Sequence, residues 1–155
     1  MRSPLPVTRG DTFELTEFLR ASDLTTSGIG EPDVRLWIDV DADSRVVGST
    51  GFEISGRAAL LRSVAVSPSH RANGRGTELA QFALDELVAL GILRVWLFSR
   101  RSGEFWQKLG FESASTEELA VALATTHQVR AFTESGQLRD ETAWCRSLGG
   151  SRSAT

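Results

Sequence analysis

The chain contains 155 residues, of which 41% are hydrophobic and 24% charged, the balance of an ordinary globular domain. This composition excludes a disordered chain, a collagen-like fibre and a small disulfide scaffold. The lone cysteine, Cys145, excludes an internal disulfide, and we expect no metal site. The chain lacks an apolar run of the ~18 residues that span a bilayer, and its first residues lack the apolar core of a secretory signal. We therefore expect a cytoplasmic protein, and the net charge of −3 favours neither nucleic acid nor membrane as a partner.

Alternating strand and helix patterns predict an α/β fold. The expected strands are residues 4–9, 34–40, 45–54, 58–66, 93–98, a short strand opening at Phe111, and 142–148. The expected helices are residues 12–21, with Asp11 as N-cap and Glu14 completing a capping box, then 77–90, 103–109 and 116–124. The polar segment 22–33 is expected to be a loop or a broken helix, and the polar segment 68–76 a loop. One domain is expected over residues 1–148, with a disordered tail at 149–155.

The connections between the strands predict their directions. Short turns join the strands at 34–40, 45–54 and 58–66, so these three should be antiparallel neighbours. A helix separates strand 58–66 from strand 93–98, so this pair should be parallel with a right-handed crossover. The apolar run Val95–Phe98 predicts a buried central strand.

The most informative segment runs from Val64 to Thr77 and contains a strand end, a polar loop and a helix start. Gly74 and Gly76 allow a ligand to approach the backbone, and a helix N-terminus offers free N–H groups and a partial positive charge. Together these features suit a pyrophosphate, with Arg71 and Arg75 adding charge at the rim. An ordinary glycine-rich connector is the alternative. A Walker loop is excluded because no lysine follows Gly76, and the dinucleotide fingerprint because Leu79 replaces its third glycine.

The pattern R-x-x-G-x-G after a strand ending Val-x-Val-x-Pro resembles the acetyl-CoA loop of the GNAT superfamily of N-acetyltransferases. The later segment Phe105-Trp106-Gln-Lys-Leu-Gly110-Phe111 matches that family's aromatic-x-lysine-x-Gly-Phe motif in the expected order. The resemblance implies a GNAT-like mixed sheet, mostly antiparallel, with one splayed parallel strand pair and flanking helices. It also implies direct transfer of an acetyl group from acetyl-CoA to an amine.

The same resemblance implies which residues hold acetyl-CoA. The backbone of the strand end would pair with the pantetheine arm, a backbone N–H near Val66 would polarise the thioester carbonyl, and the loop amides would hold the pyrophosphate. The implied cofactor-binding residues are Val64, Ala65, Val66, Arg71, Ala72, Asn73, Gly74, Arg75, Gly76, Thr77, Ser99, Phe105 and Trp106.

The chain departs from the family at the acid that protonates the departing thiolate. The family usually has a tyrosine where this chain has Trp106, and the sequence contains no tyrosine. An indole N–H is a donor but not a useful acid. A thiol has a pKa of about 8.5, so its thiolate can leave and take a proton from water at modest cost. We therefore expect no essential acid of the tyrosine type. Ser99 and Ser102 lie near the family's acid and cofactor positions and are the substitute hydroxyls.

Glu53 and Arg62 are the candidate acceptor-side residues. Glu53 lies near the end of a strand expected to border the splayed gap, and it could accept the proton of the attacking amine. A solvated strand-end carboxylate is the equally weighted alternative. Arg62 is a charge within an apolar strand, so it needs a partner, either an acceptor carboxylate or an internal glutamate such as Glu53.

Two further segments, Gly51–Val66 and His127–Leu138, are similar to a bacterial subgroup of arsenic-resistance N-acetyltransferases. That resemblance implies an acceptor like a small amino acid, including arsenic-containing ones. Two other functions stay open: a module that binds or senses acyl-CoA without turnover, and acetylation of a protein or peptide amine. Exposed edge strands make a homodimer possible.

Overall fold

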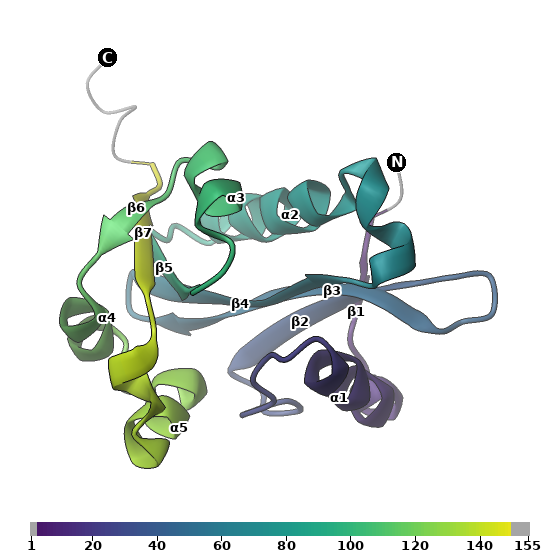
Figure 1. Cartoon of the computed structure of the whole chain (residues 1–155), viewed down its shortest axis with the longest axis horizontal. Coiled ribbons are helices and arrows are strands. Elements are labelled where there is room, and N and C mark those ends of the chain that lie inside the picture. Colours follow the sequence, from purple (N-terminus) through teal and green to yellow (C-terminus); the bar gives the residue numbers. More distant parts are fainter. Residues whose placement is uncertain (1–2, 150–155) are drawn as a thin grey trace. The chain divides into compact units, whose positions relative to one another are not determined.

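The computed structural model describes residues 3–149, apart from the side chain of Ala72 (Figure 1). Residues 3–52 and 61–86 form one compact unit, and residues 53–60 and 87–149 form a second. The expectation of a single domain through residue 148 stays a prediction. Most of the predicted tail, residues 150–155, lies outside the described residues.

Within the described residues the strands are hydrogen-bonded in the order β1-β2-β3-β4-β5-β7-β6. Their bounds are β1 (Leu5–Pro6), β2 (Val34–Val40), β3 (Val46–Ser55), β4 (Ala58–Val66), β5 (Arg94–Phe98), β6 (Glu112–Ala114) and β7 (Ala143–Ser147). The α-helices are α1 (Thr12–Ala21), α2 (Arg75–Ala89), α3 (Gly103–Lys108), α4 (Thr116–Ala122) and α5 (His127–Ser135). The short 3₁₀ helices between residues 3 and 149 are η1 (Arg9–Asp11), η2 (Pro68–Asn73) and η3 (Gln137–Asp140). None of the helices between residues 3 and 149 is long and apolar enough to cross a bilayer.

Strand β2 of the first unit is covered by α1 on one face and by α2 on the other. Successive side chains of a strand point to opposite faces, so neighbouring residues of β2 contact different helices. Leu36 and Ile38 join a buried cluster with Leu15 and Leu19 of α1. Trp37, between them, meets Phe82 of α2 edge-on at 5.3 Å between ring centroids. The same alternation directs the next odd-numbered residue, Asp39, toward α2, where it pairs with Arg75.

The start of α1 differs from the prediction. The helix spans the predicted residues, but the Asp11 side chain makes no hydrogen bond that caps α1. Asp11 Oδ2 instead accepts from the backbone N–H and the hydroxyl of Thr8, at 2.8 and 2.9 Å, and so closes η1. Glu14 Oε2 accepts from the backbone N–H of Val46 at 2.7 Å, so it stabilises β3 rather than a capping box.

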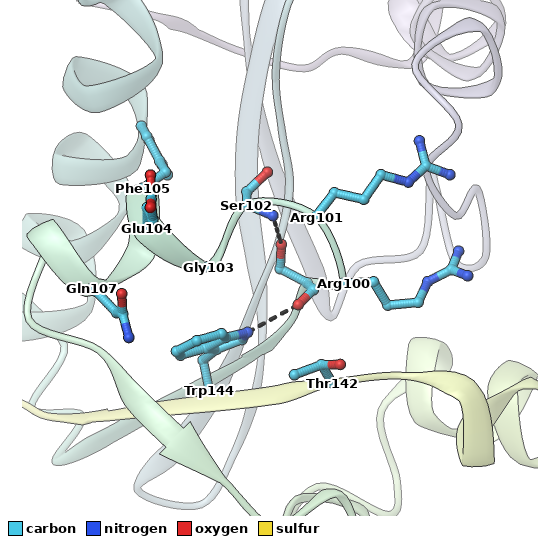
Figure 2. Close-up of a pocket in the computed structure, with 10 residues that line it drawn as sticks. Arg100, Arg101, Ser102, Gly103, Glu104, Phe105, Gln107, Thr142 and Trp144 are labelled. Atoms are coloured by element: carbon cyan, nitrogen blue, oxygen red, sulfur yellow. Dashed lines mark hydrogen bonds between the residues drawn. The ribbon is translucent and has the colours of Figure 1, made fainter.

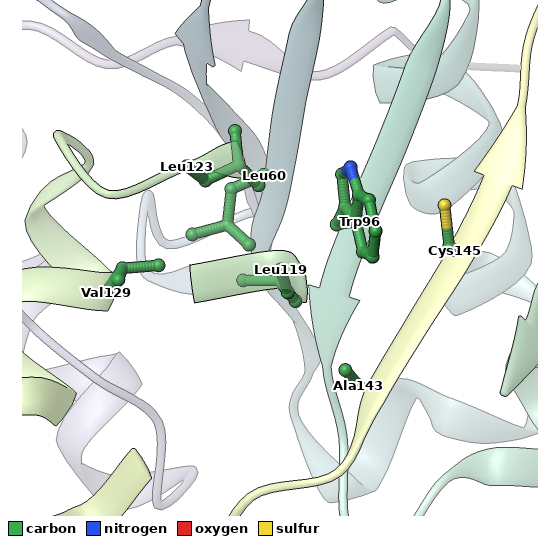
Figure 3. Close-up of a cluster of buried hydrophobic side chains, with 7 residues drawn as sticks. All are labelled: Leu60, Trp96, Leu119, Leu123, Val129, Ala143 and Cys145. Carbon is green, nitrogen blue, oxygen red and sulfur yellow. The ribbon is translucent and has the colours of Figure 1, made fainter. Parts of the chain in front are cut away.

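The second unit contains the parallel strand pair that the sequence predicted. Its register runs from Ala58 opposite Arg94 to Leu60 opposite Trp96. On the other side of β5, β7 is antiparallel, and β6 pairs antiparallel with β7. Leu119 of α4, Leu123 directly after that helix and Val129 of α5 pack in a buried cluster with Leu60, Trp96, Ala143 and Cys145 (Figure 3). The mixed, mostly antiparallel sheet with one parallel pair is the predicted fold class.

One prediction next to a helix was wrong, and one helix was not predicted. The segment 68–76 is not a loop throughout, because η2 occupies Pro68–Asn73 and α2 already begins at Arg75, which places Gly76 inside the helix. No helix was predicted after residue 124, yet α5 runs from His127 to Ser135. The Thr126 hydroxyl caps it by accepting from Val129 N, and Gly136 ends it with a φ of 81°.

Candidate functional site

The loop between β4 and α2 is shaped by one left-handed residue. After β4, Ser67 N donates to Val47 O at 2.8 Å, and η2 then runs to Gly74, whose φ of 72° reverses the chain into α2. The first helical bond of α2 runs from Glu78 N to Gly74 O at 3.2 Å. The N–H groups of the first turn, at Arg75, Gly76 and Thr77, therefore precede the helical ladder and carry the positive end of its dipole. A glycine turn that leads into a helix N-terminus lies where the glycine spacing indicated it, and the binding of an anion there stays a prediction.

The two arginines of this loop have partners within the first unit. Arg71 Nε donates to Val66 O at 2.9 Å, which ties η2 back to the end of β4. Arg75 donates to both carboxylate oxygens of Asp39, and its Nη1 donates to Glu78 Oε1 at 2.8 Å. The hydrogen bond to Asp39 holds the pKa of Arg75 above its ordinary value. Arg75 was predicted to place charge at the rim, but its guanidinium is held by two carboxylates instead.

A small cavity of about 300 Å³ adjoins this loop within the first unit. Its walls include Val66, Asn73 and Arg75 among the predicted cofactor residues, together with His70. The His70 Nδ1 lies 2.9 Å from Ser67 Oγ and 3.0 Å from Ser69 Oγ, so the imidazole is part of the loop's own hydrogen bonding. Of the other predicted residues, Val64, Ala65 and Gly76 are half-buried, and Thr77 is exposed.

Strand β4 is distorted just before this loop. Ser63 has a φ of 62°, a left-handed conformation that is uncommon for a non-glycine residue and typical of a β-bulge. Its backbone oxygen accepts from Ser49 Oγ at 2.6 Å, and its own hydroxyl accepts from Arg62 Nε at 3.1 Å. Arg62 is only 3% exposed, so the predicted mid-strand charge is buried. The distortion was missed because the residue that adopts it is serine.

Glu53 is buried at the N-terminus of α5. Its side chain is 2% exposed, so the alternative of a solvated strand-end carboxylate is wrong. Glu53 Oε1 accepts from His127 N at 2.6 Å, and Oε2 accepts from Gln128 N at 3.1 Å. Both donors belong to the first turn of α5, whose dipole complements the negative charge. Because α5 was not predicted, this connection could not be foreseen.

A second cavity, of about 600 Å³, opens in the second unit where β5 leads into α3 (Figure 2). Its lining includes the predicted residues Ser99 and Phe105 together with Arg100, Arg101 and Trp144. Ser99 organises the wall, because its backbone oxygen accepts from Trp144 Nε1 at 2.9 Å and its hydroxyl accepts from Ser102 N at 3.2 Å. The guanidinium groups of Arg100 and Arg101 project to the same side, away from the indole of Trp144 (Figure 2).

Trp106 is a packing residue of α3. It is 7% exposed, and its ring meets Phe105 at 4.8 Å and Phe111 at 5.5 Å between centroids, both edge-on.

Cys145 is buried in β7, and its sulfur accepts a hydrogen bond from Arg94 Nε at 3.0 Å.

The model of the acetyltransferase (GNAT) family matches residues 6–111, which contain the β4–α2 loop and the aromatic segment of α3. The chain belongs to the GNAT family. Amino-acid acetyltransferases of Pseudomonas syringae are 33% identical over 67 residues, which is 43% of this chain and 16% of theirs. The matched segment thus spans about a sixth of those relatives.

Solved structures share the fold at low sequence identity. An acetyltransferase of the GNAT family from Staphylococcus aureus superposes with a TM-score of 0.71 at 15% identity, covering 95% of this chain and 99% of that one. N-acetylglutamate synthase from Neisseria gonorrhoeae, solved with coenzyme A and N-acetyl-glutamate, has a TM-score of 0.66 at 18% identity. That comparison covers 96% of this chain and 36% of the synthase. The predicted GNAT-like fold is confirmed.

Proposed function

We propose that this protein is an acetyl-CoA-dependent N-acetyltransferase whose acceptor is the amine of a small molecule resembling an amino acid. The observation that carries the proposal is the turn at Gly74, with its φ of 72°, which leads directly into the first turn of α2 in a GNAT-family chain. Such a turn presents backbone N–H groups at a helix N-terminus, where a pyrophosphate is bound without a dedicated cation.

The known activities of similar proteins support both proposed substrates, acetyl-CoA and an amino-acid-like amine. The curated relatives are amino-acid acetyltransferases, and one structural neighbour was solved with coenzyme A and an acetylated amino acid. For this chain both substrate classes are proposals, because the amino-acid acetyltransferases match only 43% of it and the synthase shares only its fold. The acceptors to be tested therefore include ordinary and arsenic-containing amino acids.

Acetyl-CoA supplies a thioester carbon at which the acceptor nitrogen forms a C–N bond while the C–S bond breaks. In our proposal the amides of residues 71–77 bind the pyrophosphate, the backbone of residues 64–66 binds the pantetheine arm, and an N–H near Val66 polarises the carbonyl. Ser99, Phe105 and Trp106 of the second unit stay proposed cofactor contacts on the family resemblance.

Glu53 stays the proposed general base. Its carboxylate oxygens accept the backbone N–H groups of His127 and Gln128, and a carboxylate is a suitable acceptor for the proton of an attacking amine. The two backbone donors also fix the carboxylate in one orientation, which favours proton transfer along a defined direction. Arg62 stays the proposed partner of an acceptor carboxylate, with an internal ion pair as its alternative role.

The replacement of the family's tyrosine by Trp106 favours one second candidate, a module that binds acyl-CoA without turnover. Release of free thiol from acetyl-CoA, measured across amino acids, arsenic-containing amino acids, simple amines and peptides, separates the functions. Turnover with small amino acids supports the proposal. Turnover with peptides alone would indicate a protein acetyltransferase, and tight binding of acetyl-CoA without thiol release would indicate the binding module.

A further inference from the structure

Arg75 lies between the two glycines of the proposed acetyl-CoA loop and is the first residue of α2. Its side chain turns back to β2, where Nε lies 2.5 Å from Asp39 Oδ2 and Nη2 lies 2.6 Å from Asp39 Oδ1. The Arg75 side chain is 13% exposed and that of Asp39 5%. A paired, two-bond contact of this kind fixes direction as well as distance.

The surrounding backbone leaves room for this ion pair. Gly48 of β3 lies beneath it, and a Cβ there would come within 3.3 Å of Asp39 Cβ and 3.0 Å of Leu79 Cδ1. The absence of a side chain at Gly48 thus lets both Asp39 and the first turns of α2 lie close against β3. Asp39, Gly48 and Arg75 come from three elements, so their meeting is a property of the folded unit and not of the loop alone.

The same contacts make Arg75 a poor direct ligand for phosphate. Of its five N–H donors, one each from Nε, Nη2 and Nη1 is taken by Asp39 and Glu78. One guanidinium with two carboxylates also carries a formal net charge of −1, which offers an anion no attraction. We therefore expect Arg75 to affect the binding of an anion mainly through the position in which it holds the backbone of α2.

We infer that Arg75 is a positioning residue: through its ion pair with Asp39, it fixes the first turn of α2 in the orientation in which the loop amides bind the pyrophosphate. This inference rests on the proposed function, in which residues 71–77 bind acetyl-CoA. It assigns to Asp39, a buried carboxylate outside the loop motif, an indirect role in binding an anion.

The substitution Asp39→Asn tests this role because the two explanations predict opposite signs. If Arg75 contacted phosphate directly, removal of the neighbouring negative charge would free the guanidinium and tighten acetyl-CoA binding. If Arg75 positions the helix, Asp39→Asn should weaken binding about tenfold and raise KM for acetyl-CoA, with kcat at saturation little changed. The control Glu17→Gln removes one negative charge from an exposed pair with Arg20 and should leave both constants unchanged. Equal or tighter binding by folded Asp39→Asn would overturn the inference.

Arg75→Lys is the second variant, and it keeps the charge while losing the two-bond geometry. We expect it to weaken acetyl-CoA binding to a similar extent. The double variant, Asp39→Asn with Arg75→Lys, should bind acetyl-CoA no more weakly than the weaker-binding of the two single variants, because both substitutions remove the same contact. Additive losses, or wild-type affinity in Arg75→Lys, would contradict the inference. Absence of acetyl-CoA binding by the wild-type chain would instead refute the proposed function, so the two failures are distinguishable by calorimetry on the wild type.

Discussion

The carboxylate of Glu53 accepts a hydrogen bond from the backbone N–H of His127 at 2.6 Å, which joins β3 to the first residue of α5. The other oxygen accepts from Gln128 N, so a single buried side chain satisfies two N–H groups that the helix itself leaves unpaired. The proposed general base is therefore also a helix anchor, and substitutions of Glu53 must separate these two roles.

For Glu53→Gln we expect two losses. An amide can accept only one of the two N–H bonds, so the free energy of unfolding should fall by about 1–3 kcal/mol. Loss of the base should lower kcat by roughly 100- to 10,000-fold and flatten the acidic limb of the pH–rate profile. The measurements are thermal unfolding and the rate of thiol release at several pH values.

The control for Glu53 is Ser115→Ala, since Ser115 caps α4 in the same unit by accepting from Glu118 N at 3.1 Å. It should cost about 1 kcal/mol of stability without changing kcat. If Glu53→Gln lost stability but kept its kcat and pH profile, Glu53 would be a helix anchor only.

Arg62→Lys should raise KM for acceptors that carry a carboxylate more than for simple amines. A lysine keeps the charge but cannot form the paired bonds by which a guanidinium holds a carboxylate. Comparison of an amino acid with the corresponding decarboxylated amine measures the difference. An equal change in KM for both acceptors, together with a lower Tm, would show that Arg62 supports only the fold.

Trp106→Phe should retain most of kcat. The indole packs edge-on against Phe105 and Phe111, so its removal should lower stability by about 0.5–3 kcal/mol through packing alone. Steady-state kinetics with acetyl-CoA and the best acceptor provide the check. A thousandfold fall in kcat at unchanged stability would assign Trp106 a chemical role.

Gly103→Ala should destabilise the protein although alanine favours helices. A Cβ at Gly103, the first residue of α3, would lie 2.9 Å from Cζ2 of Trp144, whose indole N–H is bonded to Ser99 O. Relief of this overlap should cost about 1–3 kcal/mol and displace the wall of the 600 Å³ cavity. Gly10→Ala is the matched control, because its Cβ would come no nearer than 3.8 Å to Thr8 Oγ1. Tryptophan fluorescence and thermal unfolding of both variants decide the matter.

The bounds of a strand were predictable where the local pattern of apolar and turn residues is enough to define them. Strands β2 and β4 have the predicted bounds, because each has an apolar pattern limited by turn residues. The start of α2 was placed two residues late, since Gly76 disfavours a helix locally. The contact between Arg75 and Asp39, 36 residues apart, belongs to the folded unit and is not visible in a local pattern.

The candidate site was predictable in its motif and not in its supporting contacts. The glycine spacing indicated the turn before α2, because a positive φ such as that of Gly74 is typical of glycine. The left-handed Ser63 carries no such signal. Helix α5 has few apolar positions, and only its caps, Thr126 and Gly136, marked its ends. Because α5 was not predicted, the burial of Glu53 against its first turn was not predicted either.

Calorimetric titration of acetyl-CoA into Gly76→Ala, beside the wild type, tests the central claim most directly. Gly76 is the second residue of α2, so alanine should leave the helix as stable as before or more so, while its Cβ narrows the approach to the loop amides. Gly74→Ala is less suitable because a φ of 72° strains any side chain. We predict wild-type binding of acetyl-CoA and at least about tenfold weaker binding by Gly76→Ala at undiminished Tm. Equal affinities of the two proteins would contradict the placement of the pyrophosphate on this loop.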